Sequence, residues 1–401
     1  MRKGGLFRVQ DAALVLAAFG VLVVSLVIDV RYGAGTLERI SSGSMDVHMD
    51  FDVFWHSAKA LLDGRNIYFG TGGPDSSANP PLWTVLMAPL GLLEPLAAYR
   101  SFVLITLLTS LGYLAWMADE LRLRVGWAVV GVGVLLLSSP LLGTLALGQM
   151  YPLLALGLVA AWVSDRRDRP VLSGFALGLV VAVKPQLVPI ILWPLARRKW
   201  GMFWATLSSG AVATLVSIIV TGPRAMLDWL SYVGNRRPDG FWDNHTLPGS
   251  AVRLFAENNF VEPLAIAPWM VTVAYVLGMA AVVLSAIKAR RDPEMGLWAL
   301  VAASLLASPI AWHNYLLLLG PGILLLLSRG QKAAALFLLA LQSIPPQWPG
   351  LWKDEGTTLA ALALTLYLHI LIAHWLAFLT HDEKTAKEAA ASGAGQSVPA
   401  E

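Results

Sequence analysis

Residues 11–30, DAALVLAAFGVLVVSLVIDV, form an apolar run, and the polar stretch MDVHMDFDVFW follows it closely at residues 45–55. A helix needs about 20 consecutive apolar residues to cross a bilayer. The run therefore predicts a first membrane-spanning helix, which we expect to be retained because no small-residue cleavage site follows it. The polar stretch then lies at a membrane boundary, where charged side chains are costly unless they have a function. Together the two segments predict a membrane protein with a chemical site at one membrane face.

The composition extends this prediction to the whole chain. Hydrophobic residues make up 56% of the 401 residues and charged residues only 14%, whereas soluble domains contain roughly 25% charged residues. We therefore expect an all-α polytopic membrane protein with about 10–12 transmembrane helices. Residues 1–380 should form a single integral-membrane domain, and residues 381–401 a disordered cytoplasmic tail. Because the chain contains no cysteine, disulfides and thiolate chemistry are excluded.

Short clusters of arginine and lysine predict the orientation, because cytoplasmic loops carry an excess of these residues. The clusters that we expect on the cytoplasmic side are 2–8, 122–124, 166–169, 197–199, 288–291 and 329–332. The connections 31–78 and 223–266 are then external, and both termini are cytoplasmic. The net charge of only +3 suits such loops better than it suits nucleic-acid binding.

An amphipathic helix is predicted over residues 51–62, where Phe51, Phe54 and Ala58 recur on one helical face. Asp63 and the glycine after it end the helix, which should lie flat on the membrane surface. Asp50 precedes its first turn. This aspartate is either only the N-cap of the helix, or a functional carboxylate that the helix holds at the mouth of a site.

A metal site is an alternative use of the same polar residues. His48, Asp50 and Asp52 alternate along the chain, and His56 lies one helical turn after Asp52. Carboxylate-rich sites of this kind favour a hard divalent cation. Few other acidic residues occur in the expected external loops, so an enzyme without a metal or another cofactor is the favoured prediction.

Three cations lie where burial or the charge rule disfavours them. Lys184 and Pro185 fall in the middle of the apolar run 170–196 and predict a broken helix, which is tolerated at depth only inside protein or beside a cavity. A buried lysine must find an anion or lose its charge, so a lipid phosphate or an internal carboxylate is its expected partner. Arg236 and Arg237 lie in an expected external loop and are candidates for binding a phosphate, with a solvated loop as the alternative.

Further polar candidates lie near the expected external boundaries. Gln149 begins a helix, where it either caps the backbone or contacts the substrate. Asn244 and His245 belong to the long external loop, and His313 lies between two apolar runs next to Trp312. A lone histidine is more often structural than catalytic, but the polar and aromatic neighbours of His313 make both roles plausible. Most tryptophans at such boundaries belong to the interfacial belt, although one of them could stack on a sugar.

Several of these motifs, in this order and spacing, carry a resemblance. They are DFDVFWHSAKALLDGRNIY at 50–68, NPPLW at 79–83, LGQM at 147–150, NHTL at 244–247 and SPIAWHNY at 308–315. The chain resembles bacterial type C glycosyltransferases that use polyprenol-phosphate sugars, over about residues 10–330. The most similar group is the polyprenol-phosphate-mannose-dependent α-mannosyltransferases, which include actinobacterial enzymes that extend phosphatidylinositol mannosides. The resemblance implies a type C glycosyltransferase fold with external juxtamembrane helices.

The same resemblance implies an activity and a site. The activity is inverting transfer of mannose from polyprenyl-phosphate mannose to a glycolipid or lipid-linked glycan, at the external face of a bacterial plasma membrane. Asp50 matches the position of the presumed general base of the family, with Asp52, His48 and His56 as second-line candidates. His313 is expected to be a positioning partner, although its following residues depart from the family pattern. The expected donor-binding residues are Lys184, Arg236, Arg237, Gln149, Asn244, His245 and Trp312.

Two other functions remain open from the sequence. Related actinobacterial enzymes with similar openings transfer arabinofuranose from a polyprenyl-phosphate arabinose, and the sequence does not choose between the two sugars. A secondary transporter of a lipid or polar solute also has broken helices and buried charges. Such a transporter would place its charges near the midplane and often has an internal repeat, whereas the polar residues here concentrate at one face.

Overall fold

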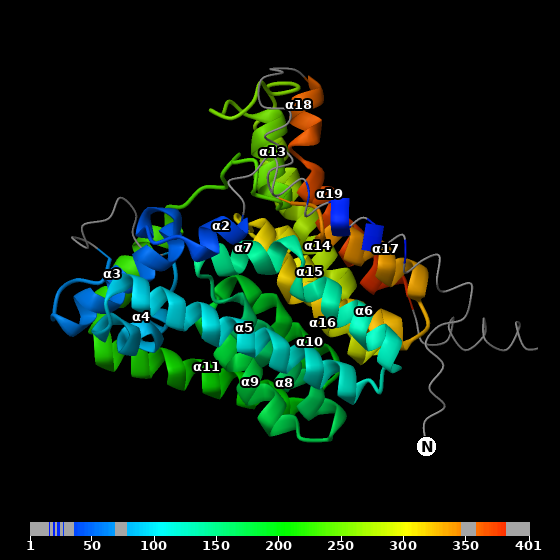
Figure 1. Cartoon of the computed structure of the whole chain (residues 1–401), viewed down its shortest axis with the longest axis horizontal. Helices are drawn as coiled ribbons and strands as arrows, with labels where there is room; N and C mark the ends of the chain where they lie inside the picture. Colours follow the sequence, from blue (N-terminus) through cyan, green and yellow to red (C-terminus); the bar gives the residue numbers. More distant parts are fainter. Residues whose placement is uncertain are drawn as a thin grey trace, which may run out of the picture.

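The computed structural model describes residues 36–68, 78–345 and 358–381, together with seven single positions between 16 and 27. All regular structure in these ranges is helical (Figure 1), which confirms the predicted all-α class. The first span predicted at 11–30 is described only at those seven positions, all of them helical, and the tail predicted at 381–401 lies outside the described residues except for His381. The elements that matter below are therefore those from residue 36 onward.

Proline marks the beginning of many helices. It fixes a helical φ and lacks an N–H that the first turn does not need, and α4, α5, α9, α12 and α15 all begin with it. The helices up to residue 196 are α2 (Thr36–Ser41), η1 (Met45–Val47), α3 (Met49–Leu62), α4 (Pro81–Met87), η2 (Ala88–Leu92), α5 (Pro95–Glu120), α6 (Val125–Leu136), α7 (Ser139–Leu147), α8 (Tyr151–Arg166), α9 (Pro170–Val183), η3 (Pro185–Ile191) and α10 (Leu192–Ala196). The later helices are α11 (Trp200–Thr221), α12 (Pro223–Gly234), α13 (Leu247–Phe255), α14 (Met270–Arg291), α15 (Pro293–Ala307), η4 (His313–Leu319), α16 (Gly320–Ser328), α17 (Lys332–Gln342), α18 (Thr358–Ala363) and α19 (Leu366–Thr380).

Four helical segments in the described part are long and apolar enough to cross a membrane: Pro95–Glu120, Trp200–Thr221, Met270–Arg291 and Ala361–Thr380. The pair α6 and α7, bent by 42°, makes a fifth if it is one broken span. Six shorter apolar helices of 10–17 residues accompany them. These helices establish a multi-pass membrane protein, and the predicted 10–12 segments require the shorter ones to cross as well.

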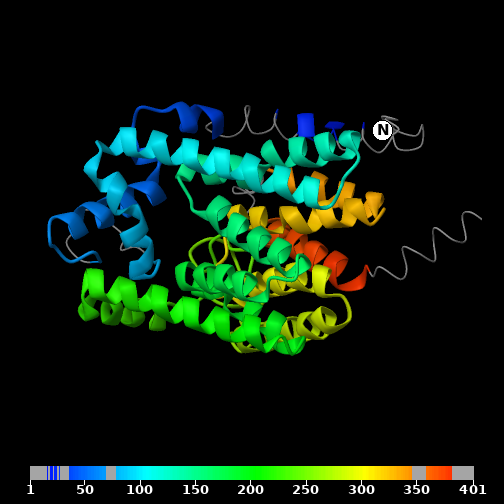
Figure 2. The same ribbon diagram turned by 90° about the horizontal axis from the view of Figure 1, so that it is seen from below.

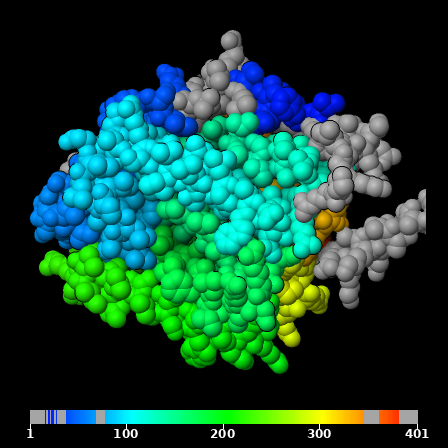
Figure 3. Space-filling view, turned by 60° about the horizontal axis from the view of Figure 1, so that its bottom comes forward, coloured from blue at the N-terminus to red at the C-terminus, as the bar shows by residue number. Residues whose placement is uncertain are grey.

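The core runs along α15. Every side chain from Met295 to Leu306 is buried, as expected for a helix that is apolar on all sides. Helices α14 and α19 and the short η3 pack around it. Figure 2 shows the cyan α5 and the green α11 toward opposite sides of the molecule, with much of the bundle between them. On the face shown in Figure 3, the blue-to-cyan segment adjoins the green one, in agreement with the packing of α4 on α11 and α12.

The predicted break at Lys184 and Pro185 is confirmed. Helix α9 ends at Val183, and the chain continues from Pro185 as the 3-10 helix η3, with Lys184 between the two. Proline at 185 cannot donate to the α9 ladder, so the regular helix stops before it. The break places the lysine side chain inside the protein, where it is 8% exposed.

The amphipathic helix predicted at 51–62 is α3, which begins at Met49 and has buried Phe51, Phe54 and Ala58. Its start corrects one expectation. The 3-10 turn η1 leads directly into α3, so His48 is the N-cap residue and Asp50 lies inside the first turn. Asp50 is therefore not the N-cap, although a carboxylate in the first turn still interacts favourably with the helix dipole.

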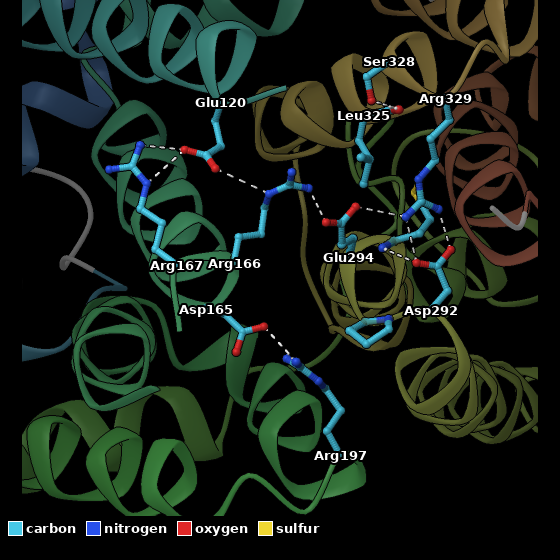
Figure 4. Close-up of polar contacts among 12 residues, drawn as sticks. Glu120, Asp165, Arg166, Arg167, Arg197, Asp292, Glu294, Leu325, Ser328 and Arg329 are labelled. Atoms are coloured by element: carbon cyan, nitrogen blue, oxygen red, sulfur yellow. Dashed lines mark hydrogen bonds and ion pairs between the residues drawn. The ribbon is translucent and has the colours of Figure 1, made fainter. Parts of the chain in front are cut away.

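The basic clusters of several loops meet at one end of the bundle, where they pair with carboxylates (Figure 4). Glu120 at the end of α5 contacts Arg166 and Arg167, and Arg166 continues to Glu294. Arg329 pairs with both Glu294, at 3.1 Å, and Asp292, at 2.5 Å, and Lys288 lies 3.6 Å from Asp292. Beside this chain of charges, Asp165 holds Arg197 at 2.8 Å. These clusters thus share one end of the molecule, as the predicted orientation requires.

Candidate active site

Asp50 is fixed from the α7–α8 turn. The Gln149 amide nitrogen donates a hydrogen bond of 2.6 Å to the Asp50 carboxylate, and Gln149 is almost fully buried. Gly148 ends α7 in the left-handed region, with φ of +70°, where glycine is the favoured residue. A Cβ at Gly148 would lie 2.5 Å from the Cβ of Phe51. The missing side chain therefore lets α3 approach the turn closely enough for Gln149 to orient Asp50.

His48 holds the beginning of α3 against α7. Its ring is fully buried, stacks on Tyr99 at 3.6 Å between centroids, and places Nδ1 2.8 Å from the Ala146 carbonyl oxygen. The Tyr99 hydroxyl donates to the neighbouring Leu145 carbonyl at 2.9 Å. These contacts anchor the segment that carries Asp50 to α7 and α5.

Lys184 is a buried cation with neutral neighbours. Its ammonium group donates to the Asn79 side-chain oxygen at 2.9 Å and lies 5.2 Å from the ring centroid of Tyr315 and 6.0 Å from that of Tyr151. Among the residues that the structure describes, no carboxylate lies within ion-pair distance of it. A buried charge is expensive without a counter-charge, and aromatic faces and one amide oxygen compensate it only in part.

Two tyrosines connect the parts of the site. The Tyr151 and Tyr315 rings lie 4.3 Å apart, and the Tyr315 hydroxyl donates to Gln186, just after the α9 break, at 3.0 Å. Tyr151 follows the turn that holds Asp50, and both Asp50 and Asp243 lie close enough to interact with it electrostatically. The two tyrosine rings therefore lie beside the Lys184 ammonium group, and two carboxylates interact with Tyr151. Asp50, Lys184 and Asp243 converge on one region of the protein.

On the Asp243 side, a carboxylate and a histidine form a buried pair. The Asp243 oxygens lie 3.0 and 2.9 Å from Nδ1 of His313, and the backbone N–H of His313 donates to the same carboxylate at 3.2 Å. Bonding at Nδ1 fixes the ring orientation and favours a proton on that nitrogen. The other nitrogen, Nε2, has no hydrogen-bond partner among the residues that the structure describes. It faces α7, because a Cβ at Gly143 would lie 2.5 Å from it.

Arg253 of α13 binds the backbone of the loop that carries Asp243. This arginine is fully buried, and its guanidinium donates to four backbone carbonyls, those of Gly240, Phe241, Asn244 and Leu364. Burial lowers the pKa of Arg253 to about 10, against the opposing charges of Asp243 and Asp239, so the group stays charged near neutral pH. Arg253 therefore acts as the internal support of the 240–244 loop.

Asn244 and His245 are part of the same support. The Asn244 amide donates to the Asp239 and Pro309 carbonyls and its oxygen accepts from the Ala311 N–H, which ties the loop to the segment before η4. Burial lowers the pKa of His245 to about 3, although Asp243 opposes this shift. His245 is therefore neutral near pH 7. The bonds of Asn244 indicate that it supports the loop.

The remaining predicted residues make other contacts. Asp52 points to His56, 3.6 Å away on α3, and both side chains are about one third exposed. Arg236 and Arg237 are exposed after α12, and Arg236 donates to the Tyr232 hydroxyl at 2.9 Å. Trp312 packs edge-on against Phe241, with centroids 5.7 Å apart.

The histidine and carboxylate side chains do not converge as metal ligands. No group of three or more that could hold a metal ion occurs among the described residues. His48 and Asp52 make the separate contacts given above, so the alternative cation site at residues 48–52 gains no support. That the protein works without a metal or another cofactor stays a prediction.

Several residues that build this region are not predictable from the sequence. Asp243 lies directly before the quoted NHTL motif, and Asn79 begins the quoted NPPLW motif, but neither was matched to its partner. Nothing in the sequence pairs Asp243 with His313, since they are 70 residues apart. Arg253 lies in the stretch expected to be an external loop, and nothing in the sequence there indicates that its side chain is buried.

The comparison with protein families supplies the identification. The profile of glycosyltransferase family 87 matches residues 78–309, more than half of the chain. The chain belongs to glycosyltransferase family 87. This membership confirms the resemblance and the membrane glycosyltransferase class inferred from the motifs, and it gives the transporter alternative no support.

Relatives of this family 87 glycosyltransferase are named as sugar transferases. A relative from Mycobacterium tuberculosis, named polyprenol-phosphate-mannose-dependent alpha-(1-2)-phosphatidylinositol mannoside mannosyltransferase, is 25% identical over 335 residues, covering 75% of this chain and 76% of the relative. An alpha-(1->3)-arabinofuranosyltransferase from Corynebacterium glutamicum is 23% identical over 274 residues, covering 65% of this chain and 62% of the relative. Among solved structures, ArnT from Cupriavidus metallidurans bound to undecaprenyl phosphate aligns with 97% of this chain and 81% of its own, at 15% identity and a TM-score of 0.38.

Proposed function

We propose that this family 87 glycosyltransferase transfers a mannosyl residue from polyprenyl-phosphate mannose to a glycolipid or lipid-linked glycan at the external membrane face. The observation that carries the proposal is Lys184, a buried cation whose described partners are an amide oxygen and two aromatic rings. A phosphate would provide the missing counter-charge. The name of the Mycobacterium tuberculosis relative, which specifies a polyprenol-phosphate-mannose donor, supports the same donor class.

In the proposed reaction, the acceptor hydroxyl oxygen attacks the anomeric carbon of the donor sugar while its proton passes to the Asp50 carboxylate. The bond between the anomeric carbon and the phosphate oxygen breaks, and polyprenyl phosphate leaves with the bonding electrons. Lys184 stabilises the negative charge that develops on the phosphate. Because this leaving group needs no proton, one carboxylate base suffices, and a single displacement inverts the anomeric configuration.

The structure favours Asp50 over Asp52 as the base on physical grounds. Asp50 is oriented by the buried Gln149 and lies near Tyr151, which contacts Lys184. Asp52 is partly solvated and paired with His56. Asp243, which also interacts electrostatically with Tyr151, pairs with His313. This pair is proposed to position the substrates, with Asp243 holding the imidazole ring in place.

A second donor remains a candidate because of the arabinofuranosyltransferase relative. The chemistry would be the same, with a five-membered sugar ring on the polyprenyl phosphate. No described contact selects between the two sugars. The acceptor is proposed to be membrane-anchored in both cases.

A donor panel tests the proposal. The purified full-length protein is supplied with polyprenyl-phosphate mannose, polyprenyl-phosphate arabinose or polyprenyl-phosphate glucose, together with a phosphatidylinositol mannoside acceptor, and release of polyprenyl phosphate is measured. We expect release from the mannose donor only, and only when the acceptor is present. Release from the arabinose donor alone would establish the second candidate, and no release from any donor would contradict both.

A further inference from the structure

Helix α12 lies at a membrane–water boundary, whichever side of the membrane that boundary faces. It begins at Pro223, one residue after α11, which is long and apolar enough to span a membrane and ends at Thr221. Gly222 between them has φ of +84° and ψ of 153°, a conformation that is essentially restricted to glycine. The chain therefore turns sharply as it leaves the span, and α12 starts where α11 reaches the surface.

The two faces of α12 differ. Ala225 and Trp229 face inward, where they join a small apolar cluster with Ile67 and Tyr68. Three apolar side chains spaced by three residues form the outward stripe, and they are exposed to 65%, 52% and 41%. These stripe residues are Leu227, Leu230 and Val233.

Arginines flank the outward stripe at both ends. Arg224 lies in the first turn of α12, Arg236 and Arg237 follow its last turn, and all three are exposed. Arg236 also lies 5.5 Å from the Tyr232 ring and donates to its hydroxyl, which keeps its guanidinium beside the helix. An apolar stripe with basic ends at a membrane boundary has the chemistry that an anionic lipid surface attracts.

The inward face of α12 is connected to the Lys184 site. The Trp229 indole nitrogen donates to the Ala78 carbonyl at 3.3 Å, and the Tyr68 hydroxyl donates to the Asn79 carbonyl at 2.8 Å. Asn79 in turn accepts the hydrogen bond from the Lys184 ammonium group. Two neighbouring residues thus join the α12 cluster to the cation that is proposed to bind the donor phosphate.

We propose that α12 docks on an anionic lipid surface through its outward stripe and flanking arginines, and that this contact holds Asn79 and Lys184 ready for the donor. The coupling to donor binding rests on the proposed function, whereas the lipid contact does not. Anionic lipids would then raise donor affinity without touching the donor, because an undocked α12 leaves Asn79 less firmly held.

The lipid contact can be measured by itself, because the chain has no cysteine. The full chain carrying Leu230→Cys is labelled with an environment-sensitive fluorophore and reconstituted into phosphatidylcholine vesicles with or without phosphatidylglycerol. Asp119→Cys, on the exposed end of α5, serves as the control. We expect the fluorophore at position 230 to report an apolar environment, more strongly when phosphatidylglycerol is present. Arg224→Gln and Arg236→Gln should each lower the equilibrium constant for docking about fivefold. The fluorophore at position 119 should report no such change.

Two results would overturn the contact. One is a water-like signal at position 230 in both vesicle types. The other is an apolar signal that persists in detergent and rises with protein concentration, because a second copy of the chain would then be the occupant.

Binding of polyprenyl phosphate, measured without any transfer reaction, tests the coupling. Trp229→Phe keeps the aromatic bulk but removes the hydrogen bond to Ala78. We expect this variant to bind polyprenyl phosphate several-fold more weakly while the signal at position 230 stays unchanged. Equal affinity in Trp229→Phe and the wild type, or equal affinity in both vesicle types, would show that α12 is not coupled to the Lys184 site. Failure of the wild type itself to bind polyprenyl phosphate would instead contradict the proposed function.

Discussion

Asp50 and Lys184 are opposite charges with different surroundings, and this difference assigns them different chemistry. Asp50 is half-buried and receives a hydrogen bond from a neutral amide, so it is oriented as a carboxylate. Lys184 is buried with neutral partners, so an added anion is favourable there. Asp243 and His313 bind each other at 2.9 Å, and this pair can hold its position without a ligand.

Replacing Asp50 by asparagine should stop transfer while preserving the fold. Asparagine keeps the size of the side chain but cannot take a proton, and loss of a general base costs about 10²–10⁴-fold in rate. The rate of sugar transfer by Asp50→Asn is the measurement, with Asp52→Asn as the matched control that should retain most activity. The reverse pattern, a dead Asp52→Asn and an active Asp50→Asn, would move the base to position 52.

Lys184→Met should weaken the binding of polyprenyl phosphate by about 10–100-fold, the range expected when a hydrogen bond to a charged group is lost. Methionine keeps most of the apolar length of the lysine side chain, so the melting temperature should fall little or even rise. Lys59→Met, on the exposed side of α3 and paired only at the surface, is the control and should bind normally. Normal binding by Lys184→Met would show that the lysine is structural.

Asp243→Asn and His313→Gln should each lower kcat. The kcat of the double variant should be no lower than that of the less active single variant. Residues that act as one unit are non-additive in this way, because removing either member already disables the pair. The three variants are compared by kcat at saturating donor. Additive losses would show that Asp243 does not act through His313.

At the level of elements, the site depends on segments that are tied to the bundle by buried polar contacts. The 240–244 loop is held by Arg253, and the helix ends near Glu120 and Asp292 are held by charge pairs. These two supports differ in their response to substitution and to pH.

Arg253→Lys should destabilise the protein by about 2–4 kcal/mol, because one ammonium group cannot reach four carbonyls that a planar guanidinium satisfies together. Unfolding in detergent measures the loss. Activity should fall as well, since Asp243 and Asn244 lie on the same loop. Arg237→Lys, on the exposed surface, is the control with little expected effect, and equal stability of the two variants would contradict the assigned support.

Asp292→Asn should destabilise the protein in a pH-dependent way. Burial raises the pKa of the Asp292 carboxyl, but the hydrogen bonds and charge of Arg329 outweigh burial and leave the pKa below its usual value of 3.8. Because the folded state favours the ionised form, the stabilisation is present above about pH 4 and is lost as the pH falls below it. The free energy of unfolding of the wild type should exceed that of Asp292→Asn by about 3 kcal/mol at pH 7. This difference should shrink as the pH falls below about 4. A difference that is constant from pH 7 to pH 3 would rule out the charge contribution.

Across the whole molecule, the architecture follows from local patterns, while the site does not. The Lys184–Pro185 break and the amphipathic α3 were predictable, because proline and helical periodicity act within a few residues. The start of α3 was misplaced by two residues, since η1 leads directly into it. The partners Asn79 of Lys184 and Asp243 of His313 lie 105 and 70 residues away, so only the packed bundle brings them together.

The predicted orientation can be tested on the intact protein. Asn235→Cys, after α12, should react with a membrane-impermeant thiol reagent added outside cells, whereas Asp119→Cys, at the end of α5, should react only after the membrane is opened. The physical reason is the excess of basic clusters at the α5 end of the bundle. The opposite labelling pattern would invert the assignment and place the site on the cytoplasmic side.

The close contact at Gly143 has a consequence for the divergence of related sequences. A methyl group at this position would come within 2.5 Å of His313 Nε2 and 2.6 Å of the Asn314 side-chain oxygen, and Gly143 lies inside α7, where the backbone has little freedom to retreat. Substitution of one partner therefore constrains the other. In an alignment of many homologous chains, position 143 should covary with positions 313 and 314: sequences that retain the His-Asn pair should retain glycine, and a larger residue at 143 should accompany smaller ones at 313 or 314.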